Sequence, residues 1–281
     1  MTSAQPPGGL DPAARETFQR DGVACLRGLI VPGWIELLRE AVAETMAKPG
    51  PYAKNVAAEG GRPGMFFSEI FPSLHNAKLR RFISESRIGE VAAFLMDSRE
   101  VRYFNDHLLV KEPGTDAPTL WHQDLPYFPC AGTQVCSVWV GLDPVTRDTG
   151  AMSFALGSQR WGRQYRAANF GTGQEYEGEA LDGSMPDIDA DPSAYPTVCY
   201  EMVPGDVTFH HANTAHSARG NSSLATRRRG YSVRLTGDDV VWHSPPRIPR
   251  GFKVLEEGRR LDDPFYALLW PQRSFACGGG S

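Results

Sequence analysis

The sequence predicts a mainly β domain with flanking helices, because helix patterns come first along the chain and short strand patterns follow. Its 281 residues are enough for a single large domain, residues 1–281. With 41% hydrophobic and 22% charged residues, the composition is typical of a globular protein and not of a disordered chain. Short apolar runs bounded by turn residues are typical of a β sandwich or barrel.

The helical part is predicted from start signals and apolar spacing. Asp11 resembles an N-cap that precedes Pro12 at the first helical position. Pro32 opens a second helix, whose apolar residues recur every three or four positions as a buried stripe requires. Within residues 11–100 we expect helices at about 11–20, 32–48 and 83–96, and a short strand at 23–26.

The β core is predicted over residues 101–236, where apolar runs alternate with Gly, Pro, Asp and Asn. The predicted strands are 101–110, 135–142, 151–156, 198–203, 207–211 and 231–235. Residues 237–281 form a C-terminal segment. Residues 161–200 are expected to be an insertion, and 172–200 carry seven acidic residues without Lys or Arg. This insertion is either a solvated surface loop or a mobile lid over a cleft.

Charge and apolar patterning restrict the possible partners. The net charge of −4 argues against nucleic-acid binding, which requires a basic face. No apolar run reaches the roughly 18–20 residues of a membrane span, and the N-terminus lacks the features of a secretory signal. The five cysteines, which include Cys277, form no CxxC pair. We therefore expect a cytoplasmic protein without a membrane or nucleic-acid partner.

The residues Trp121-His122-Gln123-Asp124 contain the clearest chemical motif. In a strand, His122 and Asp124 would point to the same side and could share one metal ion. A second histidine would complete a facial triad of two His and one carboxylate, which suits non-haem iron(II). His210, His211 and His216 are the candidates, and periodicity alone does not choose between them.

Three consecutive arginines precede the last predicted strand. If the open metal positions hold a 2-oxo acid, its far carboxylate needs a cation, and the planar fork of Arg is the preferred partner. By strand alternation Arg227 and Arg229 face one side and Arg228 faces the other. Most of this basic run is expected to be solvated.

Taken together, several motifs make the chain resemble the phytanoyl-CoA dioxygenase family, from about Asp21 to about Leu235. The motifs are His122-Gln-Asp-Leu-Pro-Tyr-Phe-Pro129, Trp139, Leu142-Asp143, Gly150-Ala-Met, Gly157-Ser158, Pro204-Gly205-Asp206, His216, Asn221 and Arg227.

The resemblance implies a double-stranded β-helix, a cupin-like jelly roll, and an Fe(II)- and 2-oxoglutarate-dependent dioxygenase that uses O2. It implies that His122, Asp124 and His216 are the metal ligands and the catalytic centre. It also implies that Arg227 anchors 2-oxoglutarate, with Trp139 and His107 lining the co-substrate. The expected reaction is hydroxylation of an unactivated C–H bond in a small or medium-sized metabolite.

Two other functions remain compatible with these residues. One is a cupin-type metalloenzyme that does not use 2-oxoglutarate, and an indispensable Arg227 would argue against it. The other is a catalytically silent binding module on the same fold, against which the intact triad argues. The primary substrate, the oligomeric state and the choice between hydroxylation and desaturation, epoxidation or cyclisation are not predicted.

Overall fold

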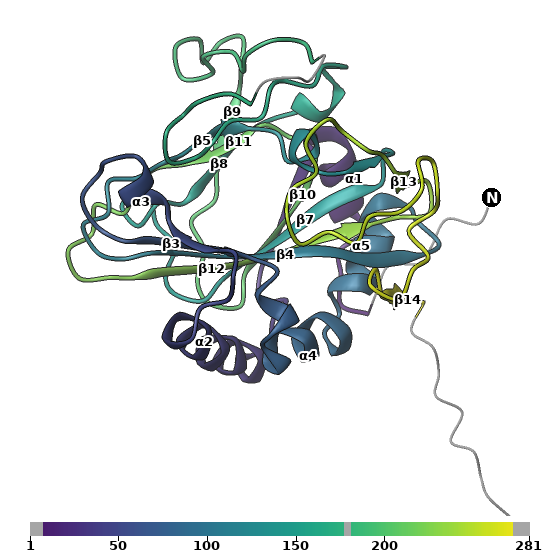
Figure 1. The fold of residues 1–281 in the computed structure, drawn as a ribbon, viewed down its shortest axis with the longest axis horizontal. Helices are drawn as coiled ribbons and strands as arrows, with labels where there is room; N and C mark the ends of the chain where they lie inside the picture. The colour runs from purple at the N-terminus through teal and green to yellow at the C-terminus, as the bar shows by residue number, and fades with distance from the viewer. Residues whose placement is uncertain (1–7, 177–180, 272–281) are drawn as a thin grey trace, which may run out of the picture.

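Two antiparallel sheets face each other, and helices cover the outer face of the larger sheet (Figure 1). The computed structural model describes residues 8–176 and 181–271. The larger sheet has eight strands and the smaller has four, and a two-stranded sheet lies beside them.

The helices are α1 (Ala13–Asp21), α2 (Pro32–Ala47), α3 (Val56–Glu59), α4 (Ala77–Glu85) and α5 (Ile88–Met96), with 3-10 turns η1 (Pro72–Leu74), η2 (Leu125–Tyr127) and η3 (Ser158–Arg160). The larger sheet contains β1 (Val23–Leu26), β10 (Val207–His211), β7 (Val135–Gly141), β12 (Arg228–Thr236), β4 (Val101–Lys111), β3 (Phe66–Ile70) and β2 (Ala53–Asn55) in that order, and β14 (Leu268–Trp270) pairs with β4. The smaller sheet contains β5 (Thr119–His122), β11 (His216–Ala218), β8 (Met152–Ala155) and β9 (Thr197–Cys199), and β13 (Val241–Trp242) pairs with β6 (Cys130–Ala131).

Helices precede most of the strands, as predicted, but the first hundred residues differ from the prediction in the third helix, in the short helix α3 and in two strands. The helix predicted at 83–96 is two helices, because Ser86 is extended with ψ of 167° and ends α4. The strands β2 and β3 were not predicted. Four of the five residues of β3 are buried, so this strand has no alternation of polar and apolar residues to reveal it.

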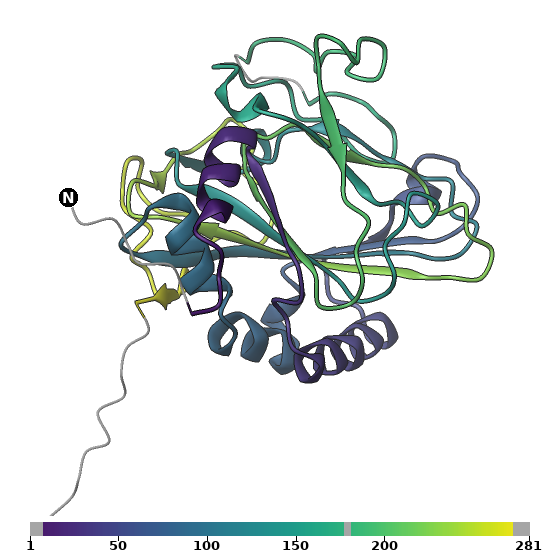
Figure 2. The same cartoon turned by 180° about the vertical axis from the view of Figure 1, so that it is seen from behind.

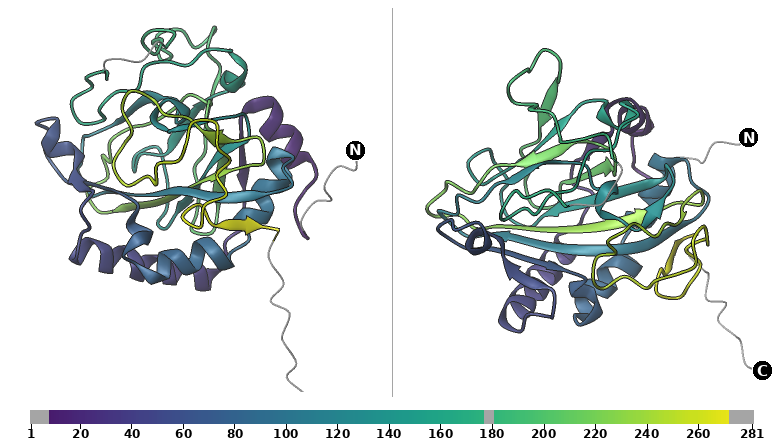
Figure 3. Two further views of the ribbon diagram at one scale, coloured as in Figure 1. Left: turned by 45° about the vertical axis from the view of Figure 1, so that its right-hand side comes forward. Right: turned by 45° about the horizontal axis from the view of Figure 1, so that its top comes forward.

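Helices close off the apolar core on one side of the larger sheet. Helices α2 and α4 lie side by side beneath that sheet (Figure 3). Helix α1 packs against β1 and α5 at the back of the molecule (Figure 2). Leu38, Phe82 and Leu95 are fully buried there. No helix among the described residues is long and apolar enough to cross a membrane.

Strand β12 shows why the space between the sheets is polar. Tyr231, Val233 and Leu235 point into the helix-side core, whereas Ser232 and Arg234 point between the two sheets. Strands β4, β7 and β10 alternate in the same way, with apolar side chains toward the helices. The inner face of the larger sheet therefore presents polar side chains to the smaller sheet.

Candidate metal centre and co-substrate pocket

The structure brings His122, Asp124 and His216 together. Their ligand atoms all lie within 4.8 Å of one another, and all three residues are buried. His122 ends β5 and His216 begins β11, and the two residues pair directly across these neighbouring strands. Two imidazoles and one carboxylate at this spacing fit the donor set of an iron(II) facial triad.

Asp124 reaches this point by a turn, which corrects the expectation that strand alternation places it there. Strand β5 ends at His122, and Asp124 has helical backbone angles, φ −74° and ψ −39°. The backbone N–H of Asp124 donates to the carbonyl of Ala212 at 2.8 Å and fixes the turn. The Oδ1 atom then lies 3.7 Å from Nε2 of His122.

Both triad histidines present the same nitrogen to the site. Nδ1 of His122 donates to the carbonyl of Leu120 at 2.8 Å, and Nδ1 of His216 donates to that of Thr214 at 2.9 Å. These bonds fix each ring and leave Nε2 unprotonated in the neutral form, as a metal ligand requires. Burial and the neighbouring histidines lower the pKa of His216 well below its usual value, which favours that neutral form.

The carboxylate of Asp124 is held ionised. Burial alone would raise its pKa, but the charge of Arg234 and the neighbouring histidines outweigh burial and hold the pKa well below its ordinary value. Ser137 on β7 donates a hydrogen bond to Oδ2. The site therefore offers one negative charge and two neutral imidazoles to a cation.

The two other candidate histidines take opposite sides of β10. His211 points away from the site, and its Nε2 donates to the carbonyl of Thr133 at 2.7 Å. His210 points into the cavity, with Nε2 at 3.5 Å from Oδ2 of Asp124, and neither of its ring nitrogens has a hydrogen-bond partner among the described residues. His216 forms the metal-binding geometry, and His210 is an additional polar group beside it.

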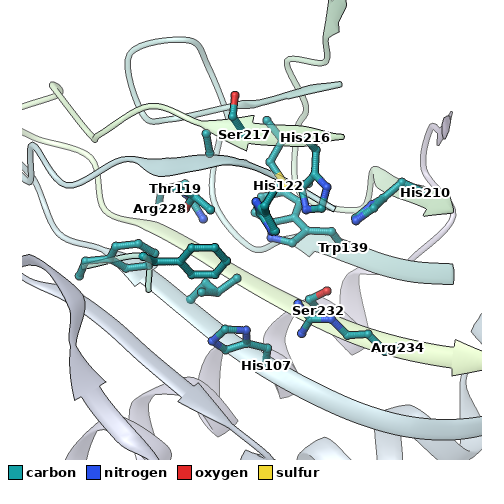
Figure 4. Close-up of a pocket in the computed structure, with 15 residues that line it drawn as sticks. His107, Thr119, His122, Trp139, His210, His216, Ser217, Arg228, Ser232 and Arg234 are labelled. Atoms are coloured by element: carbon teal, nitrogen blue, oxygen red, sulfur yellow. The ribbon is translucent and has the colours of Figure 1, made fainter. Parts of the chain in front are cut away.

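A narrow cavity of about 40 Å³ lies next to the triad and contains both residues expected to line the co-substrate (Figure 4). Trp139 is buried, and its indole N–H has no hydrogen-bond partner within residues 8–176 and 181–271. His107 shares a hydrogen bond of 2.8 Å with Ser68, and burial lowers its pKa well below the ordinary value. The buried, unpaired indole N–H of Trp139 favours a ligand that offers a hydrogen-bond acceptor.

Arg227, the arginine expected to anchor 2-oxoglutarate, does not line the cavity, and its neighbour Arg228 does. Arg227 pairs with Glu112 at 2.8 Å, and 48% of its side chain is exposed outside the cavity. Arg228 lines the cavity and is only 2% exposed. Arg229 faces away and pairs with Asp143. The predicted alternation is correct, but β12 begins at Arg228 and turns that residue inward.

Arg234 and His210 also line the cavity; Arg234 was not singled out from the sequence, and His210 was one of the three candidates for the second histidine ligand. The alternation that separates Arg228 from its neighbours extends along β12 through Ser232 to Arg234. The inward position of Arg234 on its strand could therefore have identified it as a cavity residue. Strand alternation showed that either His210 or His211 faces inward, but it did not show which of the two does.

The described part of segment 161–200 lies against the metal site. Phe170 contacts the ring of His122, with 4.6 Å between ring centroids, and lines the cavity. The hydroxyl of Tyr127 donates to the carbonyl of Ala168 and accepts from its N–H, both at 2.8 Å. Two of the acidic residues, Glu177 and Glu179, and also Cys277, lie outside the described residues.

Solved structures share this architecture. The carbocyclase SnoK from nogalamycin biosynthesis, a non-heme alpha ketoglutarate dependent enzyme, has a TM-score of 0.75 and 22% identity over 93% of this chain and 97% of its own. The epimerase SnoN, in complex with Fe3+, alpha ketoglutarate and nogalamycin RO, has a TM-score of 0.72 and 26% identity over 92% of this chain and 100% of its own. EctD from S. alaskensis, with 2-oxoglutarate and 5-hydroxyectoine, has a TM-score of 0.67 and 17% identity over 91% of each chain. The predicted double-stranded β-helix is confirmed.

The sequence comparisons point to the same class of protein. A curated relative from Stutzerimonas stutzeri, named a probable alpha-ketoglutarate-dependent hypophosphite dioxygenase, is 28% identical over 170 residues, 59% of this chain. The match covers 52% of the relative, so the chain spans about half of that protein. The family model for phytanoyl-CoA dioxygenase (PhyH) matches residues 18–230. The chain therefore belongs to the phytanoyl-CoA dioxygenase family of iron- and 2-oxoglutarate-dependent oxygenases.

Proposed function

We propose that this protein is an Fe(II)- and 2-oxoglutarate-dependent dioxygenase that hydroxylates an unactivated C–H bond of a small or medium-sized metabolite. The observation that carries the proposal is the buried group of His122, Asp124 and His216, in which both imidazoles are oriented by backbone carbonyls to offer Nε2. We assign these three residues as the metal ligands. This donor set favours a catalytic metal with open coordination positions over a closed structural site.

Arg228 is the residue we assign to the far carboxylate of 2-oxoglutarate. Its guanidinium is buried in the cavity, and Nε has no hydrogen-bond partner in the part of the chain that the structure describes. Burial lowers the pKa of Arg228 to about 10, so the side chain remains a cation at neutral pH. A desolvated cation without a paired acid is strongly stabilised by a carboxylate ligand. Trp139 and His107 would complete the walls around the co-substrate.

When bound, iron(II) supplies the oxidative chemistry with 2-oxoglutarate and O2, and the chain supplies position and a dry environment. The two triad histidines and Asp124 would hold the metal ion at one fixed position. Arg228 sets the direction from which the co-substrate enters the metal site. Phe170 covers His122 and excludes water from that side.

We infer that the segment 161–200 acts as a cover over this site. Its described residues are anchored to the turn after β5, where the side-chain amide of Gln123 donates to the carbonyl of Arg163 at 3.0 Å. The cavity of about 40 Å³ is too narrow for a co-substrate and a metabolite together. Entry of both molecules would require Phe170 and its neighbours to move outward.

The decisive experiment is a substrate screen scored by succinate formation. The purified protein is supplied with Fe(II), 2-oxoglutarate, O2 and one candidate metabolite at a time, and products are identified by mass. We expect succinate formation that depends on a particular metabolite and a product heavier by one oxygen atom. The variant Asp124→Ala is the matched control and should give neither.

Three outcomes would contradict the proposal. Turnover that persists in Asp124→Ala would show that Asp124 is not a required metal ligand. Metal-dependent turnover of a metabolite without 2-oxoglutarate would favour a cupin-type metalloenzyme of another kind. Failure of the wild-type protein to bind Fe(II) and 2-oxoglutarate would favour a silent binding module. A product of unchanged mass, or one lighter by two hydrogen atoms, would retain the oxygenase machinery and replace hydroxylation by epimerisation, desaturation or cyclisation.

A further inference from the structure

The cavity contains a second buried arginine that the co-substrate does not account for. Arg234 lies on the same face of β12 as Arg228, and the residue is 8% exposed. Its guanidinium makes no hydrogen bond to any described residue, and Nε is buried without a partner. Six residues along a strand separate the Cα atoms of the two arginines by about 20 Å. Figure 4 shows the two side chains on different sides of the cavity.

The nearest acid does not satisfy Arg234. Nη2 of Arg234 lies 3.8 Å from Oδ1 of Asp124, beyond hydrogen-bond distance. Asp124 already receives a hydrogen bond from Ser137 and lies beside two histidines. Once Asp124 is a metal ligand, its negative charge is shared with the metal, and Arg234 has still less compensation.

The other buried carboxylate in this region belongs to the opposite face of the sheet. Asp106 accepts hydrogen bonds from the hydroxyls of Tyr103, Tyr231 and Ser73 and from the backbone N–H of Ser73. Tyr103 and Tyr231 belong to the helix-side core. Asp106 is therefore fully bonded on that side and does not pair with Arg234.

We propose that Arg234 binds an anionic group of the primary substrate, such as a carboxylate, phosphonate, phosphinate or sulfonate. This inference rests on the proposed function, because it takes Arg228 as the partner of 2-oxoglutarate. A buried guanidinium is stable only when an anion or several acceptors surround it. Its planar fork binds the oxygens of all four groups in the same bidentate manner.

The charges of the loaded site support an anionic substrate. The charges of iron(II), Arg228 and Arg234 together exceed those of Asp124 and doubly charged 2-oxoglutarate by one positive unit. One monoanionic group at Arg234 brings the buried site to neutrality, which a low-dielectric cavity favours. Lys111 does not line the cavity and donates to the backbone carbonyl of Arg219 at 2.6 Å, so it is satisfied without a ligand.

The position of Arg234 also restricts which atom is oxidised. Because Arg234 lies beside a metal ligand, the bound anionic group would lie close to the metal. The oxidised C–H bond would then be only a few bonds from that group. A small acid that is oxidised near its charged end fits this cavity better than a long chain that is oxidised far from it.

Anion binding to the loaded protein tests the proposal without knowledge of the true substrate. The full chain is held without O2 in chloride-free buffer with Fe(II) and saturating 2-oxoglutarate. Acetate, methylphosphonate and hypophosphite are titrated in, and neutral acetamide is the control ligand. Binding is followed by calorimetry and by the change in the charge-transfer absorption of the iron–2-oxoglutarate complex.

We expect saturable binding of at least one of the three anions and none of acetamide. Arg234→Gln should raise the dissociation constant of that anion by about 10- to 100-fold, the loss expected for one charge-assisted contact. Arg234→Lys should recover part of this loss. Arg227→Gln, which removes an exposed arginine of the same strand entrance, should bind like the wild type. Arg234→Gln should not weaken the binding of Fe(II) or 2-oxoglutarate by more than about threefold, because the variant removes a positive charge beside Asp124 and no metal ligand.

Each of the other outcomes overturns the inference. If none of the three anions binds to the wild type, Arg234 is not an anion site. If Arg234→Gln weakens the binding of Fe(II) or 2-oxoglutarate as much as the binding of the anion, Arg234 supports the metal or the co-substrate. An equal loss in Arg227→Gln would indicate surface charge alone. A wild-type protein that forms no iron–2-oxoglutarate complex would instead refute the proposed function, and the absorption measured before any anion is added separates that result.

Discussion

Gly230 lies so close to Trp139 that no side chain fits between them. A Cβ atom built on Gly230 would lie 2.4 Å from Cζ2 of the indole ring, well inside van der Waals contact. The two residues belong to neighbouring strands, β12 and β7, and Gly230 follows Arg228 on the inward face. The glycine thus allows a large ring to cover the strand beside the proposed anchor of 2-oxoglutarate.

Gly230→Ala should therefore displace Trp139 and loosen the co-substrate pocket. We expect a loss of about 1–3 kcal/mol in the free energy of unfolding, the usual result of overpacking a buried site. The affinity for 2-oxoglutarate should fall as well. Thermal unfolding and a 2-oxoglutarate titration measure the two effects. Gly33→Ala is the control, because a Cβ at Gly33 in α2 has no neighbour within 4 Å.

A second substitution separates this steric effect from a general loss of stability. If the clash with the ring is the cause, the smaller side chain of Trp139→Leu should recover most of the stability lost in Gly230→Ala. Simple addition of the two losses would show that Gly230 is needed for some other reason.

His210 and His216 line the same cavity, but only His216 belongs to the proposed set of metal ligands. His216→Ala removes a ligand and should weaken Fe(II) binding by at least about 100-fold, more than the loss of a residue that only supports a ligand. His210→Ala should weaken it by less than about tenfold, because neither nitrogen of His210 hydrogen-bonds to a ligand. Anaerobic titration with Fe(II), or with Co(II) as a spectroscopic probe, measures both. A larger loss in His210→Ala would identify His210 as the distal ligand.

The affinity for 2-oxoglutarate should depend on Arg228 and not on Arg227. Arg228→Gln leaves the carboxylate of the co-substrate buried without its cation, and we expect the dissociation constant to rise by roughly 30- to 1,000-fold, or about 2–4 kcal/mol. Arg228→Lys should recover only part of the loss, because a point charge does not reproduce the planar fork. Arg227→Gln is the control on the exposed side. Equal losses in the two Gln variants would mean that neither arginine is a specific anchor.

Sequence reasoning located the metal centre because its chemistry is local. His122 and Asp124 are only two residues apart, so either a strand or a turn can bring their side chains to one point. Asp124 therefore reaches the site even though the strand ends at His122. The order of helices and strands followed from helix-start signals and short apolar runs, whereas the double-stranded β-helix followed from the family resemblance. Strand β3 escaped this reasoning because it is buried on both faces.

Arg227 was expected at the cavity and Arg228 lies there, because the inward face of a strand depends on its register. A shift of one residue in the turn between His216 and β12 exchanges the inward and outward faces of the following strand. The sequence shows the alternation among Arg227, Arg228 and Arg229 but not where the strand begins. That start is set by pairing with β4, where Arg228 lies opposite Lys111. This pairing joins positions far apart in the chain.

Buried histidines should make the metal-free protein less stable in mild acid. Burial lowers the pKa of His107, His210 and His216, so the folded protein keeps them neutral while the unfolded chain binds protons below about pH 6.5. The unfolded state then binds more protons, and the free energy of unfolding decreases as the pH falls from 7.5 to 5.5. Denaturant titrations of the metal-free protein across this range measure the slope.

His210→Leu should reduce this slope, because one such proton is removed and each contributes at most about 1.4 kcal/mol per pH unit. An unchanged slope in His210→Leu would show that His210 becomes protonated in the folded protein.

Arg228 and Arg229 should affect stability in opposite ways, because they face opposite sides of the same strand. Arg229 pairs with Asp143 through two contacts, of 2.9 and 2.5 Å, so Arg229→Met leaves a largely buried carboxylate unpaired and should cost about 1–3 kcal/mol. Arg228 has no acid partner and gains only a cation–π contact with Trp139, at 5.4 Å from the ring. Arg228→Met replaces an uncompensated buried cation by an apolar chain and should leave the metal-free protein as stable as the wild type or more stable. Urea unfolding of the metal-free variants, together with a 2-oxoglutarate titration of the iron-loaded proteins, tests both halves. A stable Arg228→Met protein that no longer binds 2-oxoglutarate would show that Arg228 binds the co-substrate and does not stabilise the fold. A loss of stability equal to that of Arg229→Met would show instead that Arg228 is a structural residue.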